Sequence, residues 1–235
     1  MFVRHRTHAI TQYLLHQQHI KALVVACNTA TAAAIHELRL EHPQLPLVGV
    51  EPALKPAVQL TRTGRVGVLA TRGTVGSDKF ARLLASLQGQ AEFEVCACNG
   101  LALAIEHTTQ PSHQDSAVAE VGRLLDTYLS SLGPLGTRPG QIDTLVLGCT
   151  HYVFAQDALR QRVGPDVTLV STGEPVARQT QRLLESAGLL RQSPAPLSLS
   201  ARLQLLSTGD LAGLRAAAQR WLQVGAPHGQ HVTIA

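Results

Sequence analysis

Residues 21–29, KALVVACNT, and residues 143–151, DTLVLGCTH, share one pattern within a single chain. Each contains an uncharged apolar run rich in Val and Leu, which predicts a buried β-strand. A small residue, a cysteine (Cys27 or Cys149) and small polar residues follow the run. The sequence after each cysteine predicts a helix. A repeat at this spacing indicates two similar α/β halves.

Outward from these two stretches, the chain alternates short apolar runs with longer helical patterns. Further strands are predicted at 47–50, 66–70, 93–98, 167–170 and 203–206. Helices are predicted at 2–18, 31–40, 77–87, 115–132, 154–163, 173–187 and 211–222. The first of these has an apolar stripe that includes Phe2 and Ile10, and no strand precedes it. Alternation of this kind is typical of a parallel sheet with helices on both faces.

We therefore expect an α/β protein built from two similar, doubly wound parallel-sheet domains that face each other. The first domain would comprise residues 1–62 and 190–235, and the second would comprise residues 63–189. The first would carry Cys27 and the second Cys149. Because no strand precedes the first helix, we expect the first domain to be incomplete at its N-terminal end.

The composition is that of a folded protein without a membrane span. Of the 235 residues, 45% are apolar and 15% are charged, which is ordinary for a globular chain. No apolar run approaches the roughly 20 residues that cross a bilayer, and the first residues lack the apolar region of a secretory signal. Four cysteines are too few for a disulfide framework. We therefore expect reduced thiols and a cytoplasmic protein.

The net charge of +4 does not indicate a nucleic-acid-binding surface. The basic residues are mostly arginines, and they are scattered along the chain rather than gathered in tracts. Aromatic side chains, on which bases would stack, make up only 3% of the sequence. A solvated surface with a mild excess of Arg explains this charge.

The two cysteines suggest acid–base chemistry. In open α/β sheets, ligands bind beyond the carboxyl ends of the strands, where both thiols fall. A helix N-terminus lowers the pKa of an adjacent thiol, and we expect this for both cysteines. Asn28, Thr29 and Thr150 would hold a carboxylate there, and His151 would exchange a proton with Cys149. If the two halves face each other, one thiol can deprotonate a stereocentre while the other protonates its opposite face.

Two segments carry a resemblance to a known family. Cys27-Asn28-Thr29-Ala30-Thr31 and Leu147-Gly148-Cys149-Thr150-His151-Tyr152 resemble the two cysteine motifs of the aspartate/glutamate racemase superfamily. The His-Tyr continuation is similar to the glutamate racemase branch. Further agreement lies at residues 49–52, 68–74 and 207–210.

The resemblance implies two α/β domains with the active site between them. It also implies cofactor-independent interconversion of L- and D-glutamate, which supplies D-glutamate for peptidoglycan and thereby supports the cell wall and cell shape. By this resemblance, Cys27 acts as the base on D-glutamate and Cys149 as the base on L-glutamate. His151 assists Cys149, and Glu106 lies near both. The substrate would be held by four residues, Asn28, Thr29, Thr74 and Thr150.

The chain also departs from the family pattern. The family has an Asp-Ser-Gly-x-Gly-Gly turn and a Pro-Tyr-Gly turn, and this sequence contains neither. Val153 stands where proline is usual, and Cys98-Asn99-Gly100 differs from the usual Cys-Pro. We expect the chain to begin after both turns, which would leave Cys27 without its acidic partner. The alternative function is therefore an inactive, truncated racemase-like protein that binds an acidic metabolite or a protein partner.

Other chemistries have weaker support. No cofactor is expected, because the three lysines lie in no phosphate-binding context that pyridoxal phosphate would need. A metal site at Cys96, Cys98, His107 and His113 lacks a second ligand pair at the usual spacing. Thiol–disulfide exchange lacks a Cys-x-x-Cys motif. A sister racemase acting on aspartate remains an alternative.

The resemblance also bears on partners. Glutamate is the expected small-molecule substrate, and a homodimer is one assembly to consider. Some relatives affect DNA gyrase, although no residue of this sequence indicates such a partner. We expect no membrane partner.

Overall fold

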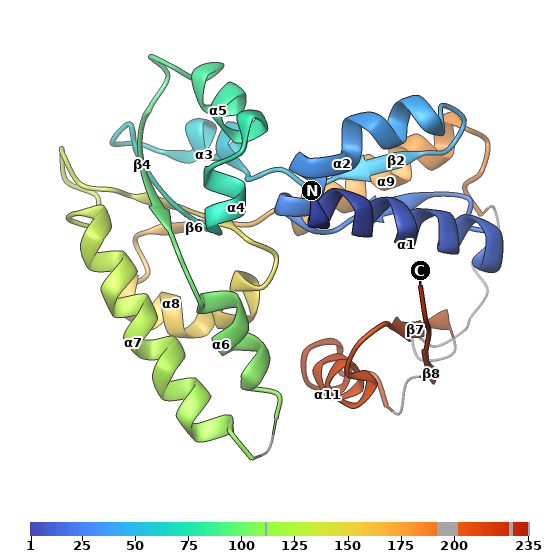
Figure 1. Cartoon of the computed structure of the whole chain (residues 1–235). Helices are drawn as coiled ribbons and strands as arrows, with labels where there is room; N and C mark the ends of the chain where they lie inside the picture. Colours follow the sequence, from blue (N-terminus) through green and yellow to red (C-terminus); the bar gives the residue numbers. More distant parts are fainter. Residues whose placement is uncertain (111, 192–201, 226–227, 235) are drawn as a thin grey trace.

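The computed structural model describes residues 1–235 except 111, 192–201, 226–227 and 235 (Figure 1). Parts of the predicted 190–235 segment therefore lie outside the described residues. The strands are β1 (Leu23–Val25), β2 (Leu47–Gly49), β3 (Arg65–Ala70), β4 (Glu92–Ala97), β5 (Thr144–Gly148), β6 (Thr168–Val170), β7 (Gln204–Ser207) and β8 (His228–His231). All strand pairs among them are parallel, which confirms the predicted α/β class.

The helices alternate with these strands as predicted. They are α1 (Phe2–Gln18), α2 (Asn28–Glu41), α3 (Leu54–Leu60), α4 (Arg72–Val75), α5 (Asp78–Ala85), α6 (Leu101–His107), α7 (Gln114–Leu132), η1 (Tyr152–Ala155), α8 (Gln156–Val163), α9 (Gly173–Ser186) and α11 (Leu211–Leu222). The short helices α3, α4 and α6 were not predicted from the sequence, and neither was strand β8. None of the described helices is long and apolar enough to cross a membrane.

The largest sheet has the strand order β4-β3-β5-β6 and is apolar on both faces. Alternate side chains of a strand point to opposite faces, so β3 and β5 each contribute to two separate cores. Leu69, Leu145 and Leu147 pack against one set of helices, and Val68 and Val146 pack against the other. This double covering explains why the strands read as continuous apolar runs.

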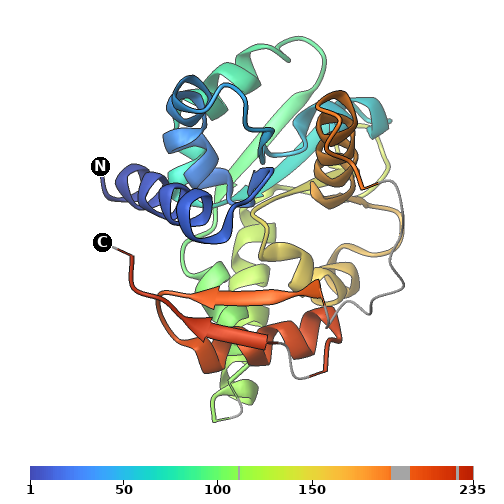
Figure 2. The ribbon, with the colours of Figure 1, turned by 90° about the vertical axis from the view of Figure 1, so that its right-hand side faces the viewer.

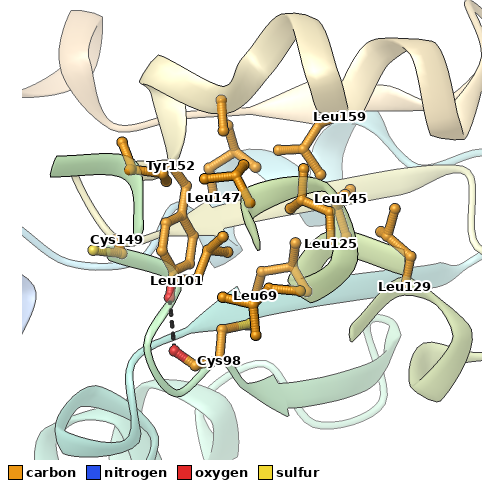
Figure 3. Packing of buried hydrophobic residues seen from close by; sticks show 14 of the residues in the cluster. Leu69, Cys98, Leu101, Leu125, Leu129, Leu145, Leu147, Cys149, Tyr152 and Leu159 are labelled. Carbon is orange, nitrogen blue, oxygen red and sulfur yellow. Dashed lines mark hydrogen bonds between the residues drawn. The ribbon is translucent and has the colours of Figure 1, made fainter. Parts of the chain in front are cut away.

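Helices α6, α7 and α8 close the first of these cores (Figure 3). Their fully buried side chains include Leu101, Leu125 and Leu159. Tyr152 is also fully buried, and its hydroxyl donates to the carbonyl of Cys98 over 3.4 Å. The thiol of Cys149 belongs to this core, so the turn after β5 is anchored against buried side chains.

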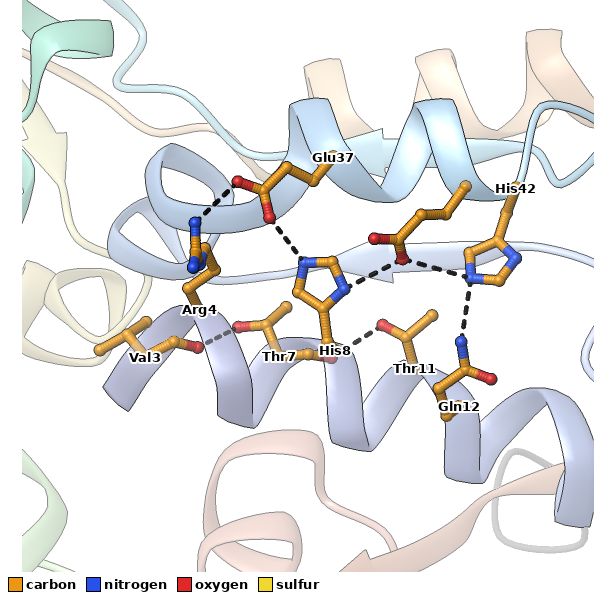
Figure 4. A network of polar contacts seen from close by, with 9 residues as sticks. Val3, Arg4, Thr7, His8, Thr11, Gln12, Glu37 and His42 are labelled. Carbon is orange, nitrogen blue, oxygen red and sulfur yellow. Dashed lines mark hydrogen bonds and ion pairs between the residues drawn. The ribbon is translucent and has the colours of Figure 1, made fainter. Parts of the chain in front are cut away.

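Strands β1 and β2 form a separate parallel sheet that contacts α2 and α9. Helix α1 lies on α2 and is held there by charged side chains (Figure 4). Arg4 contacts Glu37 over 3.1 Å, and His8 contacts Glu41 over 3.0 Å. The predicted apolar stripe of this helix faces a core only in part, because Phe2 is 80% exposed and Ile10 is 36% exposed, whereas Tyr13 and Leu14 are half-buried. The polar contacts to α2 therefore contribute to how α1 docks.

The C-terminal strands β7 and β8 pair with each other, and α11 packs against them (Figure 2). Leu205, Ala218 and Val224 form a small core within this unit. The Arg6 side chain of α1 donates to the carbonyl of Ile234 over 2.8 Å. This bond connects the C-terminal unit to the first helix of the chain.

Asp143 fixes the start of strand β5. Its carboxylate is 1% exposed and accepts hydrogen bonds from the Thr61 hydroxyl over 2.6 Å and from the Arg62 and Thr63 amides over 2.7 and 3.1 Å. The Thr144 hydroxyl also donates to it. Burial by itself raises the pKa of Asp143, but these donors outweigh burial and the net pKa is lowered.

We expect Asp143→Asn to lower the free energy of unfolding by about 1–3 kcal/mol at pH 7, because an amide cannot accept all of these hydrogen bonds. The lowered folded-state pKa means that the carboxylate contributes fully above its unfolded-state pKa of about 3.9. That contribution is lost as the pH falls through the folded-state value. Urea unfolding at pH 7 and pH 3 should therefore show a stability difference from wild type that shrinks in acid.

Arg62→Ala is the matched control. Its guanidinium is 71% exposed and lies 3.9 Å from the Asp143 carboxylate, while its backbone amide remains in the variant. We expect less than about 1 kcal/mol of change. A constant effect of Asp143→Asn from pH 7 to pH 3 would contradict this account of the carboxylate.

Candidate active site

Cys27 lies in the turn from β1 to α2. It occupies the N-cap position of α2 with an extended backbone, and its side chain is exposed. Its carbonyl accepts from the Thr31 amide over 2.8 Å, which begins the helix. The remaining amides of the first turn of α2 therefore face the space beside the thiol, where an anion would be favoured.

Cys149 directly follows β5, and its turn meets the turn of Cys27. Thr150 donates its hydroxyl to the Ala26 carbonyl over 3.2 Å, so the residues next to the two cysteines are in contact. At the end of β5, Gly148 lets this strand lie close to β3, because a Cβ there would lie 2.8 Å from the Leu69 carbonyl oxygen. The structure thus brings together the two strand ends that the sequence pattern paired.

The expectation of a lowered thiol pKa is wrong for Cys149. Its side chain is buried, and burial raises its pKa. The backbone amide of His151 acts in the opposite direction, while the neighbouring Cys27 and Glu106 raise the pKa further. Desolvation outweighs the single amide, so the protonated thiol is the favoured state of Cys149.

His151 and Glu106 form a polar pair behind Cys149. The His151 Nδ1 atom lies 3.8 Å from the Cys149 sulfur, and its Nε2 atom lies 2.7 Å from Glu106 Oε1 at the C-terminal end of α6. An ionised carboxylate only accepts hydrogen bonds, so Nε2 carries the proton in this contact. In the neutral ring Nδ1 is then free to accept a proton from the thiol.

Asn28 presents a buried amide that lacks hydrogen-bond partners. Its side chain is 5% exposed, and neither the amide nitrogen nor the amide oxygen has a partner among the described residues. Burying an amide in this way is unfavourable unless something else completes its hydrogen bonds. Asn28 and Thr74 line the same small cavity between α2 and α5, next to the cysteine turn.

Three threonine hydroxyls connect α2 to the turn after β3. Thr29 Oγ1 lies 3.0 Å from Thr71 Oγ1 and 3.3 Å from Thr74 Oγ1, and Thr71 and Thr74 are 3.0 Å apart. Sequence reasoning did not select Thr71. Its position directly after β3, at the carboxyl edge of the sheet, was a signal that could have identified it.

The candidate residues are connected by these contacts. Thr29 reaches Thr74, Thr150 reaches the Cys27 turn, and Cys149 leads to His151 and on to Glu106. The alternative metal ligands are not grouped in this way: within the described parts of the chain, no three His, Cys, Asp or Glu side chains are placed to hold a metal ion. Cys98 belongs to the core instead, where burial raises the pKa of its thiol.

Comparison with known proteins supports the relationship that the motifs suggest. Residues 4–180 match the family model described as Asp/Glu/Hydantoin racemase. The chain belongs to the Asp/Glu/Hydantoin racemase family. A glutamate racemase from Ectopseudomonas mendocina is 45% identical over 92% of this chain and 75% of its own length. One from Pseudomonas syringae is 46% identical, and the chain spans 62% of it.

Solved structures show the same relationship for this racemase-family chain. Glutamate racemase isoform RacE1 from Bacillus anthracis superimposes with a TM-score of 0.79 at 30% identity, covering 98% of this chain and 80% of that one. The Escherichia coli glutamate racemase, solved with L-glutamate and the activator UDP-MurNAc-Ala, gives a TM-score of 0.79 at 28% identity. That match covers 100% of this chain and 82% of that one. The family fold therefore extends over the whole described chain.

Gly73 sets the separation of α2 and α4. A Cβ at this position would lie 2.8 Å from the Thr29 Cγ2 methyl. We expect Gly73→Ala to lower the free energy of unfolding by about 1–3 kcal/mol through overpacking. The double variant Gly73→Ala with Thr29→Ser removes the opposing methyl, keeps the hydroxyl, and should recover most of the loss in urea unfolding.

Thr29→Ser alone provides the control for this pair. Additive effects of the two substitutions would contradict the proposed contact, because residues that touch are expected to show a coupling energy.

Proposed function

We propose that this chain interconverts L- and D-glutamate by moving the Cα proton between two cysteine thiols. The observation that carries the proposal is the junction of the two cysteine turns through Thr150 and Ala26, with the His151–Glu106 pair behind Cys149. Membership in the racemase family and the similarity to curated glutamate racemases support glutamate as the substrate.

In the proposed reaction, Cys149 acts on L-glutamate and Cys27 acts on D-glutamate. The thiolate on one side takes the Cα proton, and the electron pair of the C–H bond remains on the substrate. The thiol on the other side then gives its proton to the opposite face of Cα and becomes a thiolate. One proton enters and one leaves, so no oxidant or reductant is needed.

The raised pKa of Cys149 fits the role of proton donor when D-glutamate is converted to L-glutamate. In the opposite direction Cys149 must first lose its proton. We propose that His151 accepts that proton at Nδ1, while Glu106 stabilises the resulting imidazolium through Nε2. In this proposal the His151–Glu106 pair therefore acts in one step, the deprotonation of Cys149 before it reacts with L-glutamate.

The carbanion at Cα is stabilised by groups around the carboxylate. We propose that Asn28, Thr29, Thr74 and Thr150 hold the carboxylates and the ammonium group, together with the free amides at the start of α2. The unpartnered amide of Asn28 favours this role, because a ligand with both donors and acceptors would complete its hydrogen bonds.

The biological proposal follows from the chemistry. D-glutamate made by this chain would serve peptidoglycan synthesis in the cytoplasm. Both proton-transfer groups come from the protein, so the proposed reaction needs neither pyridoxal phosphate nor a metal.

Proton NMR of L-glutamate and of D-glutamate in D₂O tests the proposal. We expect the Cα–H signal of each enantiomer to disappear with wild-type protein and no added cofactor. Cys27→Ser and Cys149→Ser should each slow racemisation by about 10²–10⁴-fold, because each removes one of the two proton-transfer groups.

Cys96→Ser is the matched control, because this half-buried thiol contacts Ser131 rather than the candidate site. It should retain wild-type exchange. Glutamate binding by folded wild-type protein without any exchange would contradict the proposed reaction and would favour a binding protein instead.

Asn28→Leu separates binding from stability. The amide has no partner to lose, so we expect the free energy of unfolding to be unchanged or slightly higher, while glutamate exchange is lost. Thr31→Val is the comparison: its buried hydroxyl donates to the Val25 carbonyl and accepts from the Val50 amide. This variant should be destabilised by about 1–3 kcal/mol. Equal destabilisation of the two variants in urea would show that the Asn28 amide is structural.

A further inference from the structure

Helix α11 contacts the structural supports of both members of the His151–Glu106 pair. The Trp221 indole stacks on the Phe154 ring, with centroids 4.0 Å apart and planes 8° apart. The adjacent Arg220 donates from Nη1 to the Thr108 carbonyl over 2.5 Å. Two consecutive residues of α11 therefore contact η1 and the C-terminal end of α6, two elements that pack on the four-stranded sheet.

Phe154 belongs to the turn that carries His151. Its backbone amide donates to the His151 carbonyl over 3.0 Å, and Phe154 lies within the 3₁₀ helix η1. The stacked rings therefore connect α11 to the backbone that orients the imidazole.

Thr108 belongs to the end of the helix that carries Glu106. It is the C-cap residue of α6, and the next amide, of Thr109, donates to the Glu106 carbonyl over 3.0 Å. The bond from Arg220 therefore holds the end of α6 from which Glu106 extends.

These two contacts connect α11 to the segments that carry the pair, but α11 and the pair themselves face each other across open space. A cavity of about 470 Å³ separates them, and its lining includes Glu106, His151 and Trp221. The far side of the same unit is anchored on α1 by the bond from Arg6 to Ile234. The C-terminal unit is thus connected to α1 as well as to η1 and α6, while the imidazole and the carboxylate face the cavity.

We propose that Arg220 and Trp221 are positioning residues that keep His151 and Glu106 within hydrogen-bond distance. They touch neither thiol, and they act by fixing η1 and the end of α6 relative to each other. This inference rests on the proposed function, because it assigns a catalytic consequence to the geometry of the pair. Misplacement of a catalytic group by about 1 Å can cost roughly 10²-fold in rate.

The test compares Arg220→Met, which keeps the aliphatic stem but loses the donor, with Arg215→Met on the same helix. Arg215 donates to the Gly229 carbonyl inside the C-terminal unit and does not contact α6. We expect kcat for glutamate racemisation to fall about 10–100-fold in Arg220→Met and in Trp221→Ala, with KM unchanged. Trp221→Phe should retain most of the rate because it can still stack. Arg215→Met should retain wild-type kcat.

A second readout does not depend on turnover. The His151 Nε2–H proton, held by Glu106, should give a downfield NMR resonance that His151→Gln removes. We expect this resonance to broaden or vanish in Arg220→Met and Trp221→Ala and to persist in Arg215→Met. If wild-type protein is inactive, the proposed function fails while the resonance still tests the positioning.

Two results would overturn the inference. One is wild-type kcat together with an unchanged His151 resonance in Arg220→Met. The other is an equal loss in Arg215→Met, which would attribute the effect to weakened folding of α11. Arg220 is exposed, so we expect Arg220→Met to fold. This variant therefore tests the inference even if Trp221→Ala does not fold.

Discussion

Thr150 donates its hydroxyl to the backbone carbonyl of Ala26, and through this contact two sheets meet at their carboxyl edges. Neither sheet carries the candidate site by itself. The β1 side supplies an exposed thiol and an unpartnered amide, and the β5 side supplies a buried thiol with a histidine and a glutamate behind it. The position of each cysteine turn is determined by the strand that precedes it, because parallel pairing and apolar packing fix where that strand ends.

The two cysteine turns look alike in sequence but differ in environment. Cys27 caps a regular helix and is exposed, whereas Cys149 is followed by a turn and a short 3₁₀ helix and is buried against Tyr152. Desolvation therefore dominates at Cys149, and the dipole argument that suits a helix cap does not transfer to it. The proposed two-thiol reaction needs one group that holds a proton while the other accepts one, and the buried Cys149 suits the first role.

Sequence patterns predicted the parts of the fold that depend on apolar periodicity. The buried strands β3 and β5 and the helix α7 were placed correctly, because a core imposes its spacing on the residues. The bounds of α1 were also correct, although this helix buries only Thr11. Strand β8, His-Gly-Gln-His, has no such signal and exists through pairing with β7. The short α6 was missed, and Glu106 was selected by resemblance alone. Thr71 was missed although it directly follows β3 at the carboxyl edge of the sheet. The unpartnered state of Asn28 depends on tertiary contacts that no local pattern encodes.

Helix α1 is attached to α2 chiefly through ion pairs such as Arg4 with Glu37, and Thr11 alone is buried along its described length. Exposed ion pairs weaken as salt shortens the Debye length, from about 10 Å at 0.1 M to about 3 Å at 1 M. Apolar cores are strengthened by many of the same salts. High ionic strength therefore affects different parts of this molecule differently. Concentrated salt would weaken the attachment of α1 to α2 and to the C-terminal unit, while the four-stranded sheet stays folded.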